Sequence, residues 1–368
     1  MTSPLPERGV LEHHLALVAD TLLGLRYDAW SFGDSIGFEG MLAASRVLKD
    51  GRWLGFARGF IRAWAVDHRP FVRLDCTAPG LAMVEIARTT GDDHIAEAAL
   101  DLADYLVSRP RIGPLFATWD HAPLQHPYGP DALPQDEIGL LASPPAGAFV
   151  DCLHFDPPFL VALGVFAGRE DLLAEGVVQA EGYVDVLQRP DGTFDHFVLD
   201  SSDATYGQRW GRGQGWALLG LLDVLEQLPD RHAAAPSLAS AVGRLIDVML
   251  LTQRVDGHWD AIVGDTESGI ETSTAAFMAV GFRRALRLGF PVDSATAASA
   301  DRALSAALGS TTSDGRLEGV SAAVNACTLH SHYAHVPTGF VVPWGQGPLA
   351  TALAERLQAP PASTDAWP

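Results

Sequence analysis

The sequence predicts an all-α fold in which about twelve helices form an (α/α)6 toroid, an inner ring of helices surrounded by an outer ring. Three observations support this prediction. Apolar residues recur at helical spacing along most of the 368-residue chain, whereas strand-like alternation is confined to short connections. Two turn motifs are repeated. Every second predicted helix begins at glycine, proline and residues of functional type.

The helix bounds follow from apolar spacing and from punctuation by glycine and proline. We expect helices near residues 10–25, 36–49, 52–67, 79–90, 93–108, 151–167, 170–188, 212–228, 236–253, 271–288, 293–308 and 345–357. No linker-like stretch divides them, so residues 1–358 are expected to form a single domain. The tail, 359–368, is rich in proline and small residues and is expected to be disordered.

The two repeated motifs indicate a repeating structural unit. Asp-Gly-x-aromatic occurs at Asp50-Gly51-Arg52-Trp53, Asp191-Gly192-Thr193-Phe194 and Asp256-Gly257-His258-Trp259, with a weaker copy at Asp314-Gly315-Arg316-Leu317. The segment Trp210-Gly211-Arg212-Gly213-Gln214-Gly215 is echoed by Trp344-Gly345-Gln346-Gly347, and each opens a helix. The helices between these signals, such as 170–188, have the charged face of an ordinary amphipathic cover. We therefore expect the loops that lead into the inner helices to line one open end of the ring. The longest of them, 109–150, is expected to be a lid or wall.

The charge of the chain limits its partners. With 25 basic and 45 acidic residues the formal net charge is −20. Because phosphates are bound by a basic face, neither nucleic acid nor an anionic membrane surface is an expected partner. The same field would repel an acidic ligand at long range, so such a ligand would need a local basic cluster.

Cysteine content and the start of the chain favour a soluble, cytoplasmic protein. Cys76, Cys152 and Cys327 are too few and too scattered for a disulfide framework or a structural zinc site. The first residues lack the apolar segment of a secretory signal, and no stretch approaches the roughly 20 apolar residues that span a bilayer. No His-x-x-x-His or paired-cysteine set is present, so no metal or other cofactor is expected. The oligomeric state, monomer or homodimer, stays open.

The most informative stretch runs from Arg209 to Trp216 and leads into the apolar helix 217–228. Its three closely spaced glycines indicate that something approaches the backbone closely. Flat aromatic rings, one arginine and the free N–H groups of a helix N-terminus would suit a sugar ring that carries a carboxylate. The alternative is a glycine-rich turn with Trp210 and Trp216 packed in the core. These residues alone favour neither interpretation.

Several motifs, in order and spacing, carry a family resemblance. They are Trp210-Gly211-Arg212-Gly213-Gln214-Gly215-Trp216, Val150-Asp151-Cys152-Leu153 with Pro158-Phe159-Leu160, Leu74-Asp75 with Pro79-Gly80, Gly192-Thr193-Phe194-Asp195-His196, Glu271-Thr272-Ser273 and Trp344-Gly345-Gln346-Gly347. Together they resemble the unsaturated glycuronyl hydrolases of glycoside hydrolase family 105, with family 88 as a more distant relative. The likeness covers about residues 30–355.

The resemblance implies an enzyme that acts on oligosaccharides left by polysaccharide lyases. These carry a 4,5-unsaturated uronate at the non-reducing end, and the family removes it by hydrating the enol ether. A general acid protonates C4, water adds to C5 with the help of a base, and the resulting hemiketal opens. The resemblance assigns the acid/base role to Asp151, whose apolar neighbours and a second carboxylate would keep it protonated. Asp75 is the candidate for that second carboxylate, and its alternative role is to cap the helix beginning near Pro79.

The resemblance also implies a set of substrate-binding residues. Arg212 and His196 are candidates for the carboxylate or hydroxyls of the sugar, because a guanidinium offers a planar fork of donors. Trp210 and Trp216 would stack on sugar faces. The remaining candidates wall the pocket or stand for a histidine of the long loop: Phe32, Phe149, His121 and His126. Phe32 stands where the family has a tyrosine-type contact, and Phe149 where it often has tryptophan.

Two rival functions stay open at this point. The first is another glycosidase, or a sugar epimerase that uses paired histidines such as His330, His332 and His335. The second is a toroid that binds carbohydrate without catalysis, which would keep the tryptophans but would not require an acid at Asp151. The preferred disaccharide is not specified by the sequence.

Overall fold

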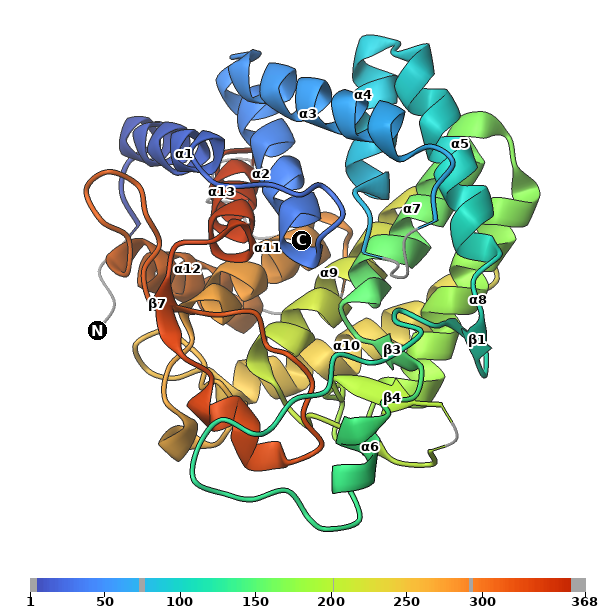
Figure 1. Cartoon of the computed structure of the whole chain (residues 1–368). Helices are drawn as coiled ribbons and strands as arrows, with labels where there is room; N and C mark the ends of the chain where they lie inside the picture. Colours follow the sequence, from blue (N-terminus) through green and yellow to red (C-terminus); the bar gives the residue numbers. More distant parts are fainter. Residues whose placement is uncertain (1–4, 73–76, 201, 291–293, 359–368) are drawn as a thin grey trace.

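Inner helices form a closed ring in the computed structural model, which describes residues 5–72, 77–200, 202–290 and 294–358. These helices are α2 (Phe32–Leu48), α4 (Gly80–Thr90), α7 (Cys152–Ala167), α9 (Gly211–Gln227), α11 (Thr272–Arg287) and α13 (Pro343–Gln358). Each packs against the next, and α13 returns to pack against α2 (Figure 1). The predicted (α/α)6 toroid is confirmed.

An outer helix precedes or follows each inner one along the chain. The outer helices are α1 (Arg8–Leu23), α3 (Arg52–His68), α5 (Asp93–Val107), α8 (Glu170–Leu187), α10 (Ala235–Thr252) and α12 (Ser294–Gly309). They bury one face, whereas α7 is buried all round from Cys152 to Gly164. The predicted helix ranges are confirmed, with the largest shift at the start of α2. It begins at Phe32 rather than 36, because Gly33 fits in the first turn against the ring of Trp344.

Helix α10 has the length and apolar composition of a membrane span, so the expectation that no stretch approaches such a span is wrong. It is the one such candidate among the described residues. In the fold it is an outer helix that packs on α8, α9 and α12. Its apolar face is therefore accounted for by packing within the ring.

Short strands connect the helices. They are β1 (Arg111–Ile112), β2 (Leu115–Phe116), β3 (Gly147–Phe149), β4 (Phe197–Leu199), β5 (Thr205–Tyr206), β6 (Val320–Ser321) and β7 (Thr338–Phe340). Antiparallel pairing joins β1 to β2, β6 to β7, and β3, β4 and β5 in that order. The expected long loop 109–150 thus contains strands and a short helix, α6 (Ile138–Ala142). The loop shares with β4 and the segment around Ala326 a small second core, separate from the main one: Ala122, Phe149, Phe197, Leu199 and Ala326.

The repeated motifs are structural parts of the ring. Gly192, Gly257 and Gly315 have φ values of 93°, 94° and 89°, and each lies against the backbone of the next outer helix. Two glutamines fasten such turns to inner helices. Gln214 exchanges hydrogen bonds with the backbone N–H and C=O of Phe194. Gln346 likewise accepts from the N–H of Leu317 and donates to the C=O of Gly315.

Candidate active site

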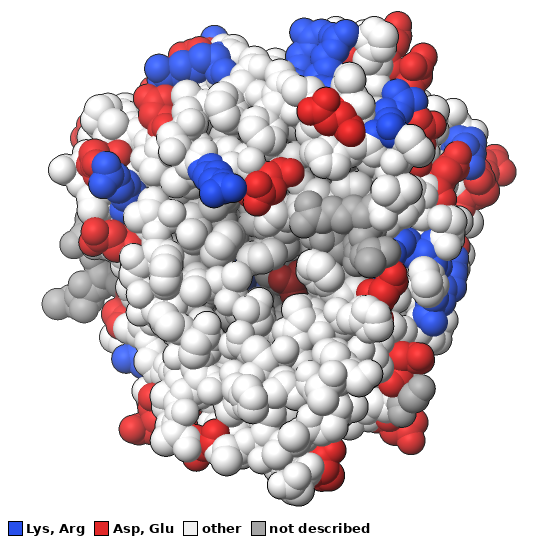
Figure 2. Space-filling model, in the orientation of Figure 1, with Lys and Arg blue, Asp and Glu red and all other residues white. Residues whose placement is uncertain are grey.

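The first turns of the inner helices and the strands before them meet at one end of the ring. Figure 2 shows a hollow near the middle of this view, with an acidic surface on its floor, while most charged side chains lie around the periphery. Asp151 occupies the N-cap position of α7 and is 9% exposed. Its side chain makes no capping hydrogen bond. The carboxylate is therefore not used to cap the helix.

Strand pairing brings His196 to Asp151. In the register of β3 and β4, Phe149 lies opposite Phe197, and the N–H of Val150 donates to the C=O of His196 at 2.7 Å. Nε2 of His196 then lies 3.4 Å from Oδ2 of Asp151. Catalytic contacts of this length commonly tighten when substrate binds.

Aromatic rings and a tyrosine hydroxyl fix the imidazole of His196. Nδ1 lies 2.7 Å from Oη of Tyr333, a residue that the sequence analysis did not select. The ring centroid of Trp210 is 4.3 Å away, and Phe149 meets the imidazole edge-on at 5.2 Å. The sequence prediction that His196, Trp210 and Phe149 lie near Asp151 agrees with this arrangement.

Arg212 is deeply buried behind the same site. Its guanidinium donates to Oγ of Ser321 at 2.6 Å, lies 3.3 Å from Oε1 of Glu271 and stacks 4.8 Å from the ring of Trp210. Burial lowers the pKa of Arg212, and the negative charges of Glu271 and Asp151 oppose this effect. The guanidinium therefore contributes a fixed positive charge near Asp151, although it is 0% exposed in this structure.

Trp216 occupies the core instead of an open surface. Its side chain is 0% exposed and packs against Phe155, Phe277 and the ring of His154. A sugar cannot reach it in this structure, because α9 turns this face toward α7 and α11. Trp216 thus packs in the core, which was the second of the two interpretations left open for it.

Phe32 lies at the start of α2, next to the site. Its half-buried ring meets Trp216 edge-on at 6.5 Å and lies 4.8 Å from the ring of Trp344. The Trp344 indole in turn donates to the C=O of Ser321, at the strand that also holds Arg212. Phe32 thus lies one aromatic ring from the strand that holds Arg212, and its role in walling the pocket stays a prediction.

The two histidines of the long loop are exposed. His121 has Nδ1 3.1 Å from the C=O of Pro144, within its own loop, and His126 lies further along. Within the described part of the chain, neither ring forms a hydrogen bond, ion pair or ring contact with Asp151 or His196. The second predicted carboxylate, Asp75, lies outside the described residues.

Neighbouring side chains explain the glycine-rich stretch at the start of α9. A side chain at Gly213 would collide with the ring of Trp210, and one at Gly215 with the ring of Phe277. What approaches this backbone so closely is therefore the protein itself. Of the two interpretations left open for this stretch, a glycine-rich turn packed within the protein accounts for these glycines, and Gln214 bonds the turn at Phe194.

The histidine cluster of the rival epimerase is also accounted for. His332 is buried, with Nδ1 3.0 Å from the N–H of Tyr128 and Nε2 3.0 Å from the C=O of Asn325. Burial lowers the pKa of His332 to about 4, so the ring is neutral at neutral pH. With both nitrogens engaged, it joins the long loop to the 325–332 segment and does not shuttle protons. His330 and His335 are exposed.

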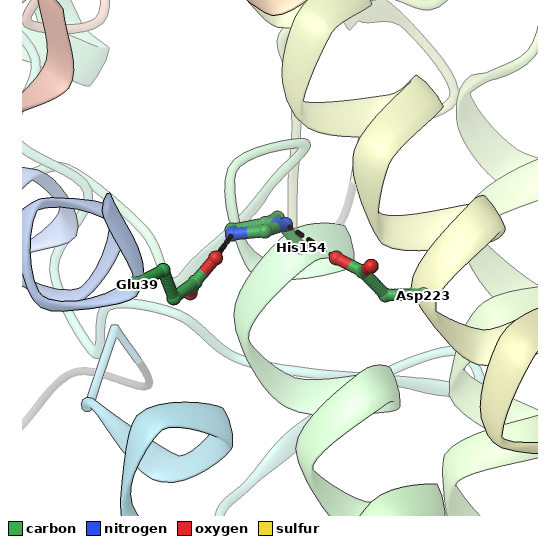
Figure 3. Close-up of side chains that lie close together, drawn as sticks. All are labelled: Glu39, His154 and Asp223. Carbon is green, nitrogen blue, oxygen red and sulfur yellow. Dashed lines mark hydrogen bonds and ion pairs between the residues drawn. The ribbon is translucent and has the colours of Figure 1, made fainter. Parts of the chain in front are cut away.

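A buried charged cluster lies one helical turn along α7 from Asp151. His154 is flanked by Glu39 from α2, 3.1 Å from Nε2, and by Asp223 from α9, 3.6 Å from Nδ1 (Figure 3). Arg284 pairs with the other oxygen of Asp223. Because the carboxylates face opposite nitrogens of one ring, and Arg284 already neutralises Asp223, the cluster suits a protonated imidazole better than a metal ion.

A cavity of about 820 Å³ opens at the far end of the ring. It is lined by the C-terminal halves of inner helices and includes Glu39, Asp223 and Arg284. Asp151 and His196 do not line it, so this cavity is separate from the candidate active site.

Comparisons with known proteins agree with the predicted resemblance. The chain matches the family model described as Glycosyl Hydrolase Family 88 over residues 22–359. It is 25% identical, over 333 residues and 90% of both chains, to the unsaturated rhamnogalacturonyl hydrolase YesR of Bacillus subtilis (strain 168).

Solved structures share the fold across nearly the whole chain. A possible member of the GH105 family from Salmonella enterica serovar Paratyphi A matches with a TM-score of 0.79 and 20% identity, covering 97% of this chain and 96% of that one. The unsaturated glucuronyl hydrolase of Bacillus sp. GL1 matches with a TM-score of 0.68 and 19% identity, covering 92% and 94%.

Proposed function

Because the chain belongs to Glycosyl Hydrolase Family 88, we propose that it removes a 4,5-unsaturated uronic acid from the non-reducing end of lyase-generated oligosaccharides by hydrating the enol-ether double bond. The names of the relatives support this substrate class, since YesR acts as an unsaturated rhamnogalacturonyl hydrolase. The observation that carries the proposal is the placement of Asp151. Its carboxylate does not cap α7, and it lies at the open end of the ring beside His196. It also interacts electrostatically with Arg212.

In the proposed reaction Asp151 transfers its proton to C4 of the unsaturated ring. The oxygen of a water molecule then bonds to C5, and the proton that this water loses returns to Asp151. The product at C5 is a hemiketal, which opens as its ring bond breaks. The opened sugar then releases the rest of the oligosaccharide. One carboxyl group serves both proton transfers, so the two-carboxylate spacing of ordinary glycosidases does not apply.

Arg212 and His196 would stabilise this chemistry from behind the sugar. The buried guanidinium of Arg212 supplies positive charge in a site with little water, where it attracts an anionic uronate more strongly than at the surface. This local charge offsets the repulsion expected from a chain with a net charge of −20. Phe32, Phe149 and Trp210 provide aromatic surface beside it.

Isotope labelling tests the proposed reaction directly. The enzyme is incubated with unsaturated disaccharides derived from rhamnogalacturonan and from glycosaminoglycan, in D₂O and separately in H₂¹⁸O. Hydration predicts loss of the enol-ether ultraviolet absorbance, deuterium at C4 and ¹⁸O at C5. An ordinary glycosidase would instead place ¹⁸O at the anomeric carbon and leave the double bond intact, and a non-catalytic toroid would change neither sugar.

A further inference from the structure

Tyr333 and His196 form a buried pair directly behind Asp151. Oη of Tyr333 lies 2.7 Å from Nδ1 of His196, and Nε2 on the other side of the same ring lies 3.4 Å from Oδ2 of Asp151. Tyr333 and His196 are each 2% exposed. Three separate segments of the chain therefore meet in a single line of polar groups that ends at the carboxylate.

Neighbouring residues pack closely around Tyr333 and His196. Gly207 has φ of 71°, and a side chain at this position would collide with both Oη of Tyr333 and Cβ of His196. Trp210 covers the imidazole at 4.3 Å, and Phe149 meets it edge-on. The ring is packed from several sides, so the hydrogen bond to Tyr333 rather than free rotation decides which nitrogen carries the proton.

The surroundings of Tyr333 indicate the direction of that hydrogen bond. Burial raises the pKa of Tyr333 well above 10, so it keeps its hydroxyl proton. A buried hydroxyl needs an acceptor for its proton, and among the described residues Nδ1 of His196, 2.7 Å from Oη, provides one. The proton of Tyr333 is therefore directed to Nδ1 of His196. The ring proton of a neutral His196 then resides on Nε2, facing Asp151.

We propose that Tyr333 is a positioning residue that acts through His196. By donating to Nδ1, it keeps a proton on Nε2, and this N–H holds Oδ2 of Asp151 so that Oδ1 is left to exchange its proton with the substrate. Oδ2 is buried and has no hydrogen-bond partner within the described residues, so it can accept from Nε2 once the 3.4 Å contact shortens. Without the hydroxyl, His196 adopts the Nδ1–H tautomer as readily as the Nε2–H tautomer. In the Nδ1–H tautomer the lone pair of Nε2 faces Oδ2. This role rests on the proposed function of Asp151.

Tyr333→Phe tests the role by removing one oxygen. We expect kcat to fall about 10- to 100-fold while KM changes little, because orientation rather than substrate affinity is lost. The alkaline limb of the rate profile should move to higher pH, because the ionised carboxylate at position 151 loses a stabilising donor. Tyr206→Phe is the matched control, since this half-buried tyrosine stacks on Phe197 and should behave as the parent. Unchanged kcat and pH profile in Tyr333→Phe would overturn the proposal.

A double-mutant cycle separates action through His196 from general damage. If Tyr333 works through the imidazole, adding Tyr333→Phe to His196→Ala should cause no further loss of kcat. Independent, additive losses would contradict that route.

Nitrogen-15 NMR of the histidine rings gives a readout that does not depend on turnover. The parent protein should show His196 as the Nε2–H tautomer, and Tyr333→Phe should show a mixture. An Nδ1–H tautomer in the parent would overturn the proposal without any variant. A parent that has the expected tautomer but leaves unsaturated disaccharides intact would refute the proposed function and not the tautomer assignment.

Discussion

His154 and Glu39 join α7 to α2 inside the ring, with Nε2 of the histidine 3.1 Å from Oε2 of the glutamate. Burial alone would lower the pKa of His154, but the nearby carboxylates of Glu39 and Asp223 outweigh it, and the pKa is raised. Burial in turn raises the pKa of Asp223 to about 6, against the opposing charges of Arg284 and His154. The imidazolium therefore links α7 to α2 and α9 by ion pairs, one helical turn from Asp151.

His154→Gln should destabilise the protein by about 3 kcal/mol near pH 6, because Glu39 and Asp223 lose their shared cation. The stabilisation by a group whose pKa is raised on folding is complete below its unfolded value, about 6.5, and is lost as pH rises through the folded value. The melting temperatures of the parent and the variant should therefore converge as pH rises above about 6.5. A constant gap between the two melting curves would show that packing, and not charge, accounts for the role of His154.

Gly215→Ala should destabilise the ring by about 1 to 3 kcal/mol, because the added methyl group would overlap the ring of Phe277. The matched control is Gly243→Ala in α10, where no atom lies within 4 Å of the added carbon. This second change should stabilise the protein by about 0.5 to 1 kcal/mol, since alanine favours helix over glycine. Chemical denaturation of both variants measures the difference, and equal effects would refute the close-packing account of the glycine cluster.

His332 should make the loop junction sensitive to acid. Its folded pKa of about 4 lies below the ordinary value of 6.5, so the unfolded chain takes up the proton first and stability falls as pH drops from 6.5 toward 4. His332→Asn removes that contribution, and its melting temperature should fall less than that of the parent between pH 7 and pH 4. If both proteins lose the same stability over this range, the neutral ring of His332 does not hold the loops together.

Most of the fold was predictable because its signals are local. The helical spacing of apolar residues and the positions of glycine and proline predict the twelve long helices found among the described residues. The residues at which these helices begin separate the inner helices from the outer ones. The start of α2 was missed since Gly33, which resembles a helix breaker, is required by contact with Trp344. The short helix α6 lacks a buried face and left no periodic signal.

The site was predictable only in part. Motif order identified Asp151, His196, Trp210 and Arg212, which the structure brings together through strand pairing and the start of α9. The role of Trp216 was ambiguous because a tryptophan in a glycine-rich turn can either stack on a sugar or pack in the core. Only the packing of α9 on α11 shows that it packs in the core.

Tyr333 was missed because it meets His196 across 137 residues of sequence. The sequence feature that could have identified Tyr333 is its position in the segment His330-Ser331-His332-Tyr333, where the histidines drew attention away from the tyrosine. Asp75 and the cytoplasmic location stay predictions.

Asp151→Asn tests the central claim most directly, since it removes the transferable proton and keeps the size of the side chain. The measurement is kcat on an unsaturated disaccharide, followed by loss of enol-ether absorbance, together with calorimetric binding of the same sugar. We predict a loss of about 10²- to 10⁴-fold in kcat, with disaccharide affinity and melting temperature close to those of the parent. Turnover at the parental rate by a folded Asp151→Asn protein would contradict the account.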